Sequence, residues 1–72
     1  MEQYFVESFR NSWKIKFEGS YVGIFPTREA AIGWAIKRAH NANARGERAS
    51  VLTRGYNGLL RVEWTSPEGK TD

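Results

Sequence analysis

The 72-residue chain has no cysteine and a single histidine, and these two shortages exclude most metal and nucleophile chemistry. Without cysteine there is no disulfide framework, no thiolate zinc site and no cysteine nucleophile. His40 alone cannot form a two-histidine metal site, and its position on the polar side of a helix predicts a solvated side chain. The glycines lack the spacing of a phosphate-binding loop, and no two carboxylates are forced together in an apolar cleft. The sequence therefore predicts a protein that is not an enzyme and uses no metal or cofactor.

Long apolar runs are also missing. No stretch approaches the roughly 18 residues of a membrane span, and the start Met1-Glu2-Gln3 lacks the basic and apolar regions of a signal peptide. The absence of cysteine suits a reducing compartment. We therefore expect a soluble, cytoplasmic protein with no membrane partner and no small-molecule substrate.

Aromatic residues are plentiful for so short a chain, with three tryptophans, three tyrosines and four phenylalanines. A domain of this size buries only about 60% of the surface that its unfolded chain exposes, so it needs a dense core. Each aromatic side chain buries on the order of 150–250 Å², which makes these residues the natural source of that core. No linker or repeat divides the chain, and we expect one domain over residues 1–66 and a disordered tail over residues 67–72.

Residues 3–25 alternate apolar and polar side chains with a period of two, which predicts three strands. Glu18-Gly19 is a two-residue hairpin turn between the second strand and the third. The register that follows pairs Phe17 with Ser20. In that register one face of the hairpin is apolar and inward, with Trp13, Ile15, Phe17, Val22 and Ile24, and the other is outward, with Lys14, Lys16, Tyr21 and Gly23.

A helix follows the third strand. Pro26 cannot donate to a strand ladder, and Thr27 is a good N-cap for a helix that begins at Arg28 and ends near residues 43–46. The helical period places small and aliphatic residues on one face: Ala31, Ile32, Ala35, Ile36, Ala39 and Ala42. Such a face packs closely on a sheet.

Two further strands are expected over residues 48–53 and 59–64, joined by a turn that contains Asn57-Gly58. In the last strand Leu60, Val62 and Trp64 share one face, and Arg61 and Glu63 share the other. The predicted fold is α+β, an antiparallel-rich β-sheet of order β-β-β-α-β-β with one helix packed on one face. Whether the third and fourth strands lie side by side in parallel or at opposite edges stays open.

Positive charge is concentrated in residues 27–54. This segment holds only Glu29 and Glu47 as acids, against these six bases: Arg28, Lys37, Arg38, Arg45, Arg48 and Arg54. A local basic patch attracts phosphates. A charged, solvated helix face that serves solubility gives the same pattern, and both interpretations stand.

The chain resembles the domain of unknown function 2188 family, short bacterial proteins, over residues 4–64. The matching segments are Tyr4-Phe5-Val6, Trp13-Lys14-Ile15, Glu18-Gly19, Phe25-Pro26-Thr27, Ala31-Ile32, Ala35, Ala39, Val51-Leu52 and Gly58. The family has a glutamate three residues after the capping threonine, where this chain has Ala30. The resemblance implies a strand-rich sheet with one helix, and it brings no established function.

A shorter stretch, residues 13–39, is similar to the N-terminal arm-binding domain of phage and transposon integrases. The similarity rests on Trp13, Gly19, Phe25-Pro26-Thr27 and Ala30-Ala31. In that domain a three-stranded sheet backed by one helix binds DNA through the face of the sheet. The resemblance implies that Lys14, Lys16 and Tyr21 contact nucleic acid, whereas outward lysines on a hairpin also serve solubility and edge protection.

The leading functional hypothesis is a small nucleic-acid-binding or regulatory protein of the kind that phages and plasmids carry. Its binding residues are Lys14, Lys16, Tyr21 and Arg61 on the sheet face, with Arg54 at the rim. The alternative is a protein-interaction module, such as an inhibitor or adaptor. It would dock through a strand edge or through a helix flank made of Trp34, Arg38, Asn41 and Arg45, because Trp and Arg are enriched at interface hot spots.

Overall fold

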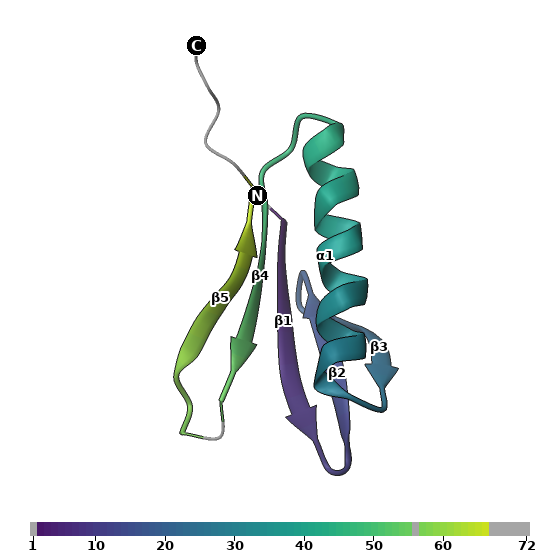
Figure 1. The fold of residues 1–72 in the computed structure, drawn as a ribbon, viewed down its shortest axis with the longest axis vertical. Coiled ribbons are helices and arrows are strands. Elements are labelled where there is room, and N and C mark those ends of the chain that lie inside the picture. Colours follow the sequence, from purple (N-terminus) through teal and green to yellow (C-terminus); the bar gives the residue numbers. More distant parts are fainter. Residues whose placement is uncertain (1, 56, 67–72) are drawn as a thin grey trace.

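The computed structural model describes residues 2–55 and 57–66 and has an α+β fold, which confirms the predicted class (Figure 1). The described part of the chain forms five strands and one helix. These are β1 (Glu2–Phe9), β2 (Ser12–Phe17), β3 (Ser20–Phe25), α1 (Arg28–Ala44), β4 (Ala49–Arg54) and β5 (Leu60–Thr65). The tail expected over residues 67–72 lies outside the described residues.

The five strands form one mixed sheet with the order β3-β2-β1-β4-β5. β1 and β4 run parallel at the centre, and the other neighbouring pairs are antiparallel. The helix begins beside the end of β3 and crosses one face of the sheet to the start of β4 (Figure 1). β4 therefore pairs with β1 and not with β3, and an antiparallel-rich sheet describes this arrangement only in part.

The core lies between α1 and the sheet. On the helix, four alanines are fully buried: Ala31, Ala35, Ala39 and Ala42. Beneath them lie Val6 of β1, Ile15 of β2 and Val51 of β4, which have no exposed surface. Alanine side chains let the helix axis approach the sheet closely, so the bulky residues of the strands fill the space. The predicted apolar face of the helix is confirmed.

The β2–β3 hairpin begins as predicted and then shifts its register. Phe17 pairs with Ser20 across a turn in which Glu18 and Gly19 both have positive φ, at 52° and 82°. A bulge follows between Ile15 and Lys16 on the β2 side, and Val22 is the extra residue on β3.

The bulge reverses the side chains of the rest of β3. Phe25, instead of Ile24, pairs with Trp13 and packs beneath the helix, and its ring covers Gly23. Ile24 pairs with Lys14 and is 63% exposed. Ile24 and Gly23 therefore point to the sides opposite to those predicted. Val22, also predicted to point inward, is the extra residue of the bulge and is exposed.

A second bulge lies between β4 and β5. Val51 pairs with Trp64 and the next pair joins Leu52 to Val62, so Glu63 is the extra residue. Trp64 packs against the core, whereas Val62 is 59% exposed on the other side of the sheet. The prediction that Val62 and Trp64 share a face is wrong, because one inserted residue reverses a strand with a period of two.

Gly33 lies in the middle of α1, exposed, and a β-carbon there would meet no atom within 4 Å. We expect Gly33→Ala to raise the free energy of unfolding by about 0.5–1 kcal/mol, because alanine loses less backbone entropy in a helix. Gly46 has equally open surroundings but a φ of 88°. Gly46→Ala should therefore lower the stability by about 1–2 kcal/mol. Urea denaturation measures both, and changes of the same sign would contradict this explanation.

Candidate nucleic-acid interface

The face of the sheet opposite α1, here called the open face, carries aromatic rings next to lysines. Phe5 and Phe9 of β1 point to this side because Tyr4 and Val6 point to the helix. The strand register places Phe5 beside Lys16 of β2 and Lys16 beside Tyr21 of β3. Rings and cations therefore alternate across three neighbouring strands.

Lys14 lies between two of these rings. Its Nζ is 4.0 Å from the ring centre of Tyr21 and 4.3 Å from that of Phe9, and Lys16 Nζ is 5.6 Å from Tyr21. The Tyr21 hydroxyl donates to Oε1 of Glu7 at 3.5 Å. Cation–π attraction holds the ammonium groups of the two lysines over the rings, and both lysines are partly exposed.

Arg54 completes the basic side of this face. It pairs with Glu7 of β1 and with Leu60 of β5, is exposed, and donates from Nη1 to the Gly58 carbonyl at 3.0 Å. On the described strands of the open face, Lys14, Lys16 and Arg54 therefore oppose the single carboxylate of Glu7. The structure brings together four of the five residues predicted to bind nucleic acid: Lys14, Lys16, Tyr21 and Arg54.

Arg61, the fifth predicted residue, lies on the helix side of the sheet. It pairs with Thr53, which is buried on that side, and its Nε is 3.7 Å from Oε2 of Glu63. The alternation of residues 59–64 predicts that Leu60 and Val62 point inward and that Arg61 points outward. Because Leu60 and Val62 pair with the outward residues of β4, Arg61 takes the opposite side.

Sequence reasoning missed Phe5 and Phe9. β1 is apolar on both faces, with Tyr4 and Val6 alternating with Phe5, so its pattern does not show which face meets the helix. The pairing with β4 decides this. Tyr4 lies beside the buried Val51, and Phe5 beside Leu52 on the open face.

The helix flank of the alternative hypothesis is partly engaged in packing. The Trp34 ring lies 5.6 Å from that of Phe25 and meets Tyr4 edge-on at 6.5 Å, measured between ring centres. The Arg38 guanidinium lies 4.7 Å from the Trp34 ring centre. Trp34 is thus partly buried against the core and is not a free anchor.

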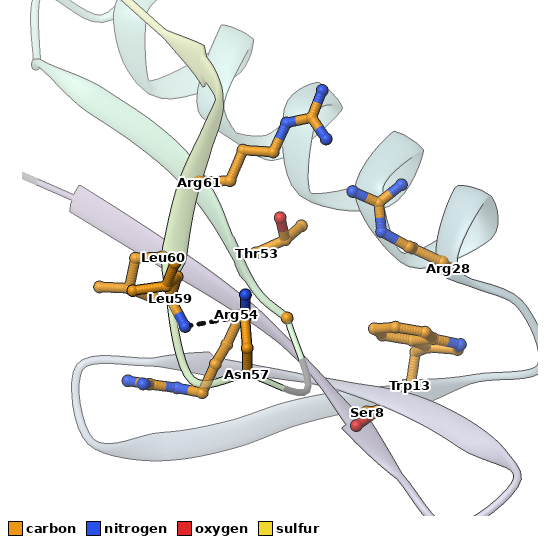
Figure 2. A pocket seen from close by; sticks show the side chains of 10 residues that line it. Ser8, Trp13, Arg28, Thr53, Arg54, Asn57, Leu59, Leu60 and Arg61 are labelled. Atoms are coloured by element: carbon orange, nitrogen blue, oxygen red, sulfur yellow. Dashed lines mark hydrogen bonds between the residues drawn. The ribbon is translucent and has the colours of Figure 1, made fainter.

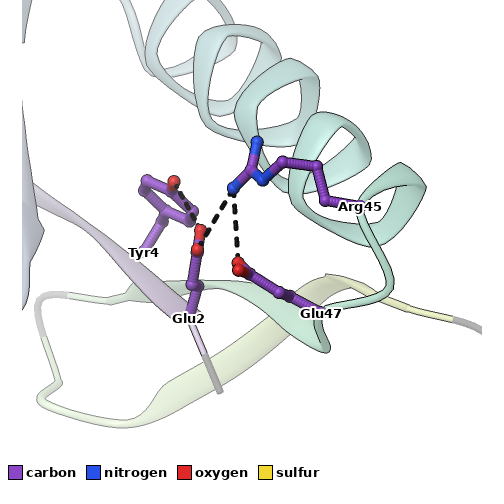
Figure 3. Close-up of polar contacts among 4 residues, drawn as sticks. All are labelled: Glu2, Tyr4, Arg45 and Glu47. Atoms are coloured by element: carbon purple, nitrogen blue, oxygen red, sulfur yellow. Dashed lines mark hydrogen bonds and ion pairs between the residues drawn. The ribbon is translucent and has the colours of Figure 1, made fainter.

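Arg45, at the end of the same flank, joins two carboxylates (Figure 3). Its Nη2 lies 3.4 Å from Oε2 of Glu2 and 3.3 Å from Oε1 of Glu47. A side-chain hydrogen bond between the two acids raises the pKa of Glu2 and lowers that of Glu47, and Arg45 lowers the pKa of Glu47 further. Trp34, Arg38 and Arg45 line a hollow of about 220 Å³, and Asn41 is not part of its lining.

No helix in residues 2–55 and 57–66 is long and apolar enough to cross a membrane. The same residues hold no group of three or more His, Cys, Asp and Glu side chains that could bind a metal ion. His40 is exposed, with its ring 4.7 Å from that of Trp64. No protein-family model, curated protein or solved structure matches the chain, so both family resemblances stay predictions.

Proposed function

We propose that the protein binds single-stranded nucleic acid through the open face. The observation that carries the proposal is the position of Lys14 between the rings of Phe9 and Tyr21, with Phe5 and Lys16 alongside. In this proposal a base stacks on the face of a ring that no lysine covers, and each lysine ammonium contacts a phosphate.

Unpaired bases suit this face better than a duplex does. Base stacking on an aromatic side chain contributes about 1–3 kcal/mol per base and tolerates any sequence. In a duplex the base faces are covered by their neighbours, and a broad sheet does not enter a groove as a helix or a two-stranded ribbon does. Phe5 and Tyr21 are two strand positions apart, about 10 Å, which leaves room for a separate base on each ring.

Fluorescence anisotropy with labelled oligonucleotides, between roughly 50 and 200 mM salt, tests the charge contribution. Three phosphate contacts, from Lys14, Lys16 and Arg54, predict a slope of log affinity against log salt of about −2 on single strands. Replacing Lys14 and Lys16 together with alanine should flatten the slope by about 1.4. Lys37→Ala, on the exposed side of α1, is the matched control. Absence of binding at the low-salt end, or an equal loss with Lys37→Ala, would contradict the proposal.

The Tyr21 ring tests the stacking contribution separately from charge. Tyr21 is 51% exposed, so its replacement should leave the fold intact. Tyr21→Ala is expected to weaken single-strand binding by about 5- to 100-fold, while Tyr21→Phe keeps the ring and most of the affinity. The same anisotropy titration measures both. If the two variants lose affinity equally, the hydroxyl and not the ring is what the ligand contacts.

A further inference from the structure

A second depression, here called the arginine groove, lies mainly on the helix side of the sheet, and Arg54 and Leu60 border it at the edge shared with the open face. It has a volume of about 670 Å³ and opens where α1 begins, beside the hairpin that joins β4 to β5 (Figure 2). In Figure 1 the β4 and β5 ends at this hairpin lie beyond the first turn of α1, so the helix does not cover this part of the sheet. The volume falls within the roughly 300–1,000 Å³ that is usual for small-molecule sites.

The groove is at the carboxyl ends of the two parallel strands. Ser8 of β1 and Thr53 of β4 line its floor, and each lies within two residues of the end of its strand. Ligands in open sheets with parallel strands bind outside those carboxyl ends, where loops and helix termini leave a crevice. The helix enters here with Arg28, its first residue.

Two arginines reach into this space from different elements. Figure 2 shows Arg28 of α1 and Arg61 of β5 extending toward one another above Thr53. Arg28 Nη2 donates to Oε2 of Glu63 at 2.8 Å, the Thr53 hydroxyl donates to the same oxygen at 2.9 Å, and Arg61 Nε lies 3.7 Å from it. One carboxylate thus faces two guanidiniums, and the cluster keeps one excess positive charge.

The exposure of the two arginines shows which one is available to a ligand. The Arg61 side chain is 77% exposed and lies 3.7 Å from Glu63, whereas the Arg28 side chain is 36% exposed and lies 2.8 Å from Glu63. The planar guanidinium of Arg61 presents several N–H donors in the geometry that matches a phosphate. Glu63, with 17% of its side chain exposed, keeps both arginines oriented toward the groove.

Trp13 supplies the apolar wall. It packs against the core through part of its ring and lines the groove through another part, below Arg28 in Figure 2. Leu59, which is 69% exposed, borders the groove from the hairpin. An indole face beside paired guanidiniums offers stacking for a heterocycle and charge for an anion in one cavity.

We propose that the arginine groove binds a nucleoside phosphate, with the phosphate on the exposed guanidinium of Arg61, next to Arg28, and the base against Trp13. Each requirement of such a ligand has a counterpart in the lining: the excess positive charge, the partly buried indole, and the Ser8 and Thr53 hydroxyls. The site goes beyond the open-face proposal, because Arg28, Arg61 and Trp13 lie on the opposite side of the sheet and the site uses none of Lys14, Lys16 or Tyr21. Arg54 borders both sites. The sequence predicts no small-molecule substrate, and it does not reveal this groove because the lining residues come from six separate elements or loops.

Isothermal titration of the full chain with AMP tests the proposal, with adenosine and inorganic phosphate as partial ligands. AMP should bind at least about tenfold more tightly than either, because it alone engages both the indole and the arginines. Arg61→Ala should weaken AMP binding by about tenfold or more, since it removes charge-assisted hydrogen bonds. Arg38→Ala, which removes an exposed arginine on the helix flank, is the matched control and should bind AMP as the parent does.

Two further arms separate this site from the open face and from a strand terminus. The Lys14→Ala, Lys16→Ala double variant should keep its AMP affinity, so the failure of one proposal does not imply the failure of the other. AMP that displaces neither a 5′-phosphorylated nor a 5′-hydroxyl oligonucleotide would place the oligonucleotide elsewhere and support a free nucleotide, whereas displacement of the 5′-phosphorylated strand alone would make a strand terminus the ligand and overturn the assignment. No AMP binding, phosphate binding as tight as AMP, or an equal loss with Arg38→Ala would overturn the nucleotide assignment.

Discussion

Ile15→Ala is expected to lower the free energy of unfolding by about 3–4 kcal/mol, the largest effect of any single truncation considered. Ile15 has no exposed surface and lies in the middle of β2, between Val6 of β1 and Gly23 of β3. Truncation would leave a cavity directly under the helix. The helix cannot move in to fill this cavity, because its buried alanines already pack against the sheet. A domain of this size has a total stability of about 4–11 kcal/mol, so a large part of it would be lost.

Ile24→Ala is the matched control, the same chemical change one strand away. Ile24 is 63% exposed because the β3 bulge turns it to the open face, and its truncation should change the stability by less than about 0.5 kcal/mol. Urea denaturation followed by far-UV circular dichroism measures both variants. Equal losses would show that Ile24 is buried, and the observed register of β3 would then be wrong.

Trp34→Ala is expected to lower the free energy of unfolding by about 2–4 kcal/mol. Its indole packs against Phe25 and meets Tyr4 edge-on, so truncation removes two aromatic contacts and opens the space between the helix and β3. The loss should fall below that of a fully buried tryptophan, because Trp34 is only partly buried. Urea denaturation provides the measurement.

Two further variants separate the contribution of the Trp34 ring from that of Arg38. Trp34→Phe retains an aromatic ring and should recover more than half of the loss, and Arg38→Ala removes only an exposed cation–π contact, worth about 0.5–1 kcal/mol. If Trp34→Ala leaves the stability unchanged, the ring does not support the fold. The protein-interaction hypothesis, which needs Trp34 as a surface anchor, would then gain its main support.

The prediction of the helix from sequence succeeded for a local reason. Thr27 accepts a hydrogen bond from the Ala30 N–H at 3.1 Å, as an N-cap does, and the buried alanines follow the helical period. Gly46, with positive φ, follows the end of the helix. Caps, turns and periodicity act within a few residues, so the sequence shows them directly.

The errors all came from features that one strand does not display. A β-bulge inserts one residue and reverses the side chains on one side of it relative to the other, which puts Ile24 on the open face and puts Leu60 and Val62 on the face opposite Trp64. Up to the bulge, the alternating pattern of such a strand is the same as that of a strand without a bulge, so the sequence pattern does not reveal the bulge. The direction of Arg61 followed from the same error, because it was inferred from the leucine and valine on either side of it.

The sequence by itself therefore determined the order and approximate ends of the elements, the buried face of α1 and the pairing of lysines with Tyr21 on one side of a hairpin. Tertiary structure decided which side of β1 meets the helix, the parallel pairing of β1 with β4, and the separation of Arg61 from Arg54. It also created the arginine groove, whose walls come from segments as distant as Ser8 and Arg61. The physical reason is that periodicity reports burial along one segment, whereas sheet register and clefts depend on free-energy differences between distant segments that meet only in the folded chain.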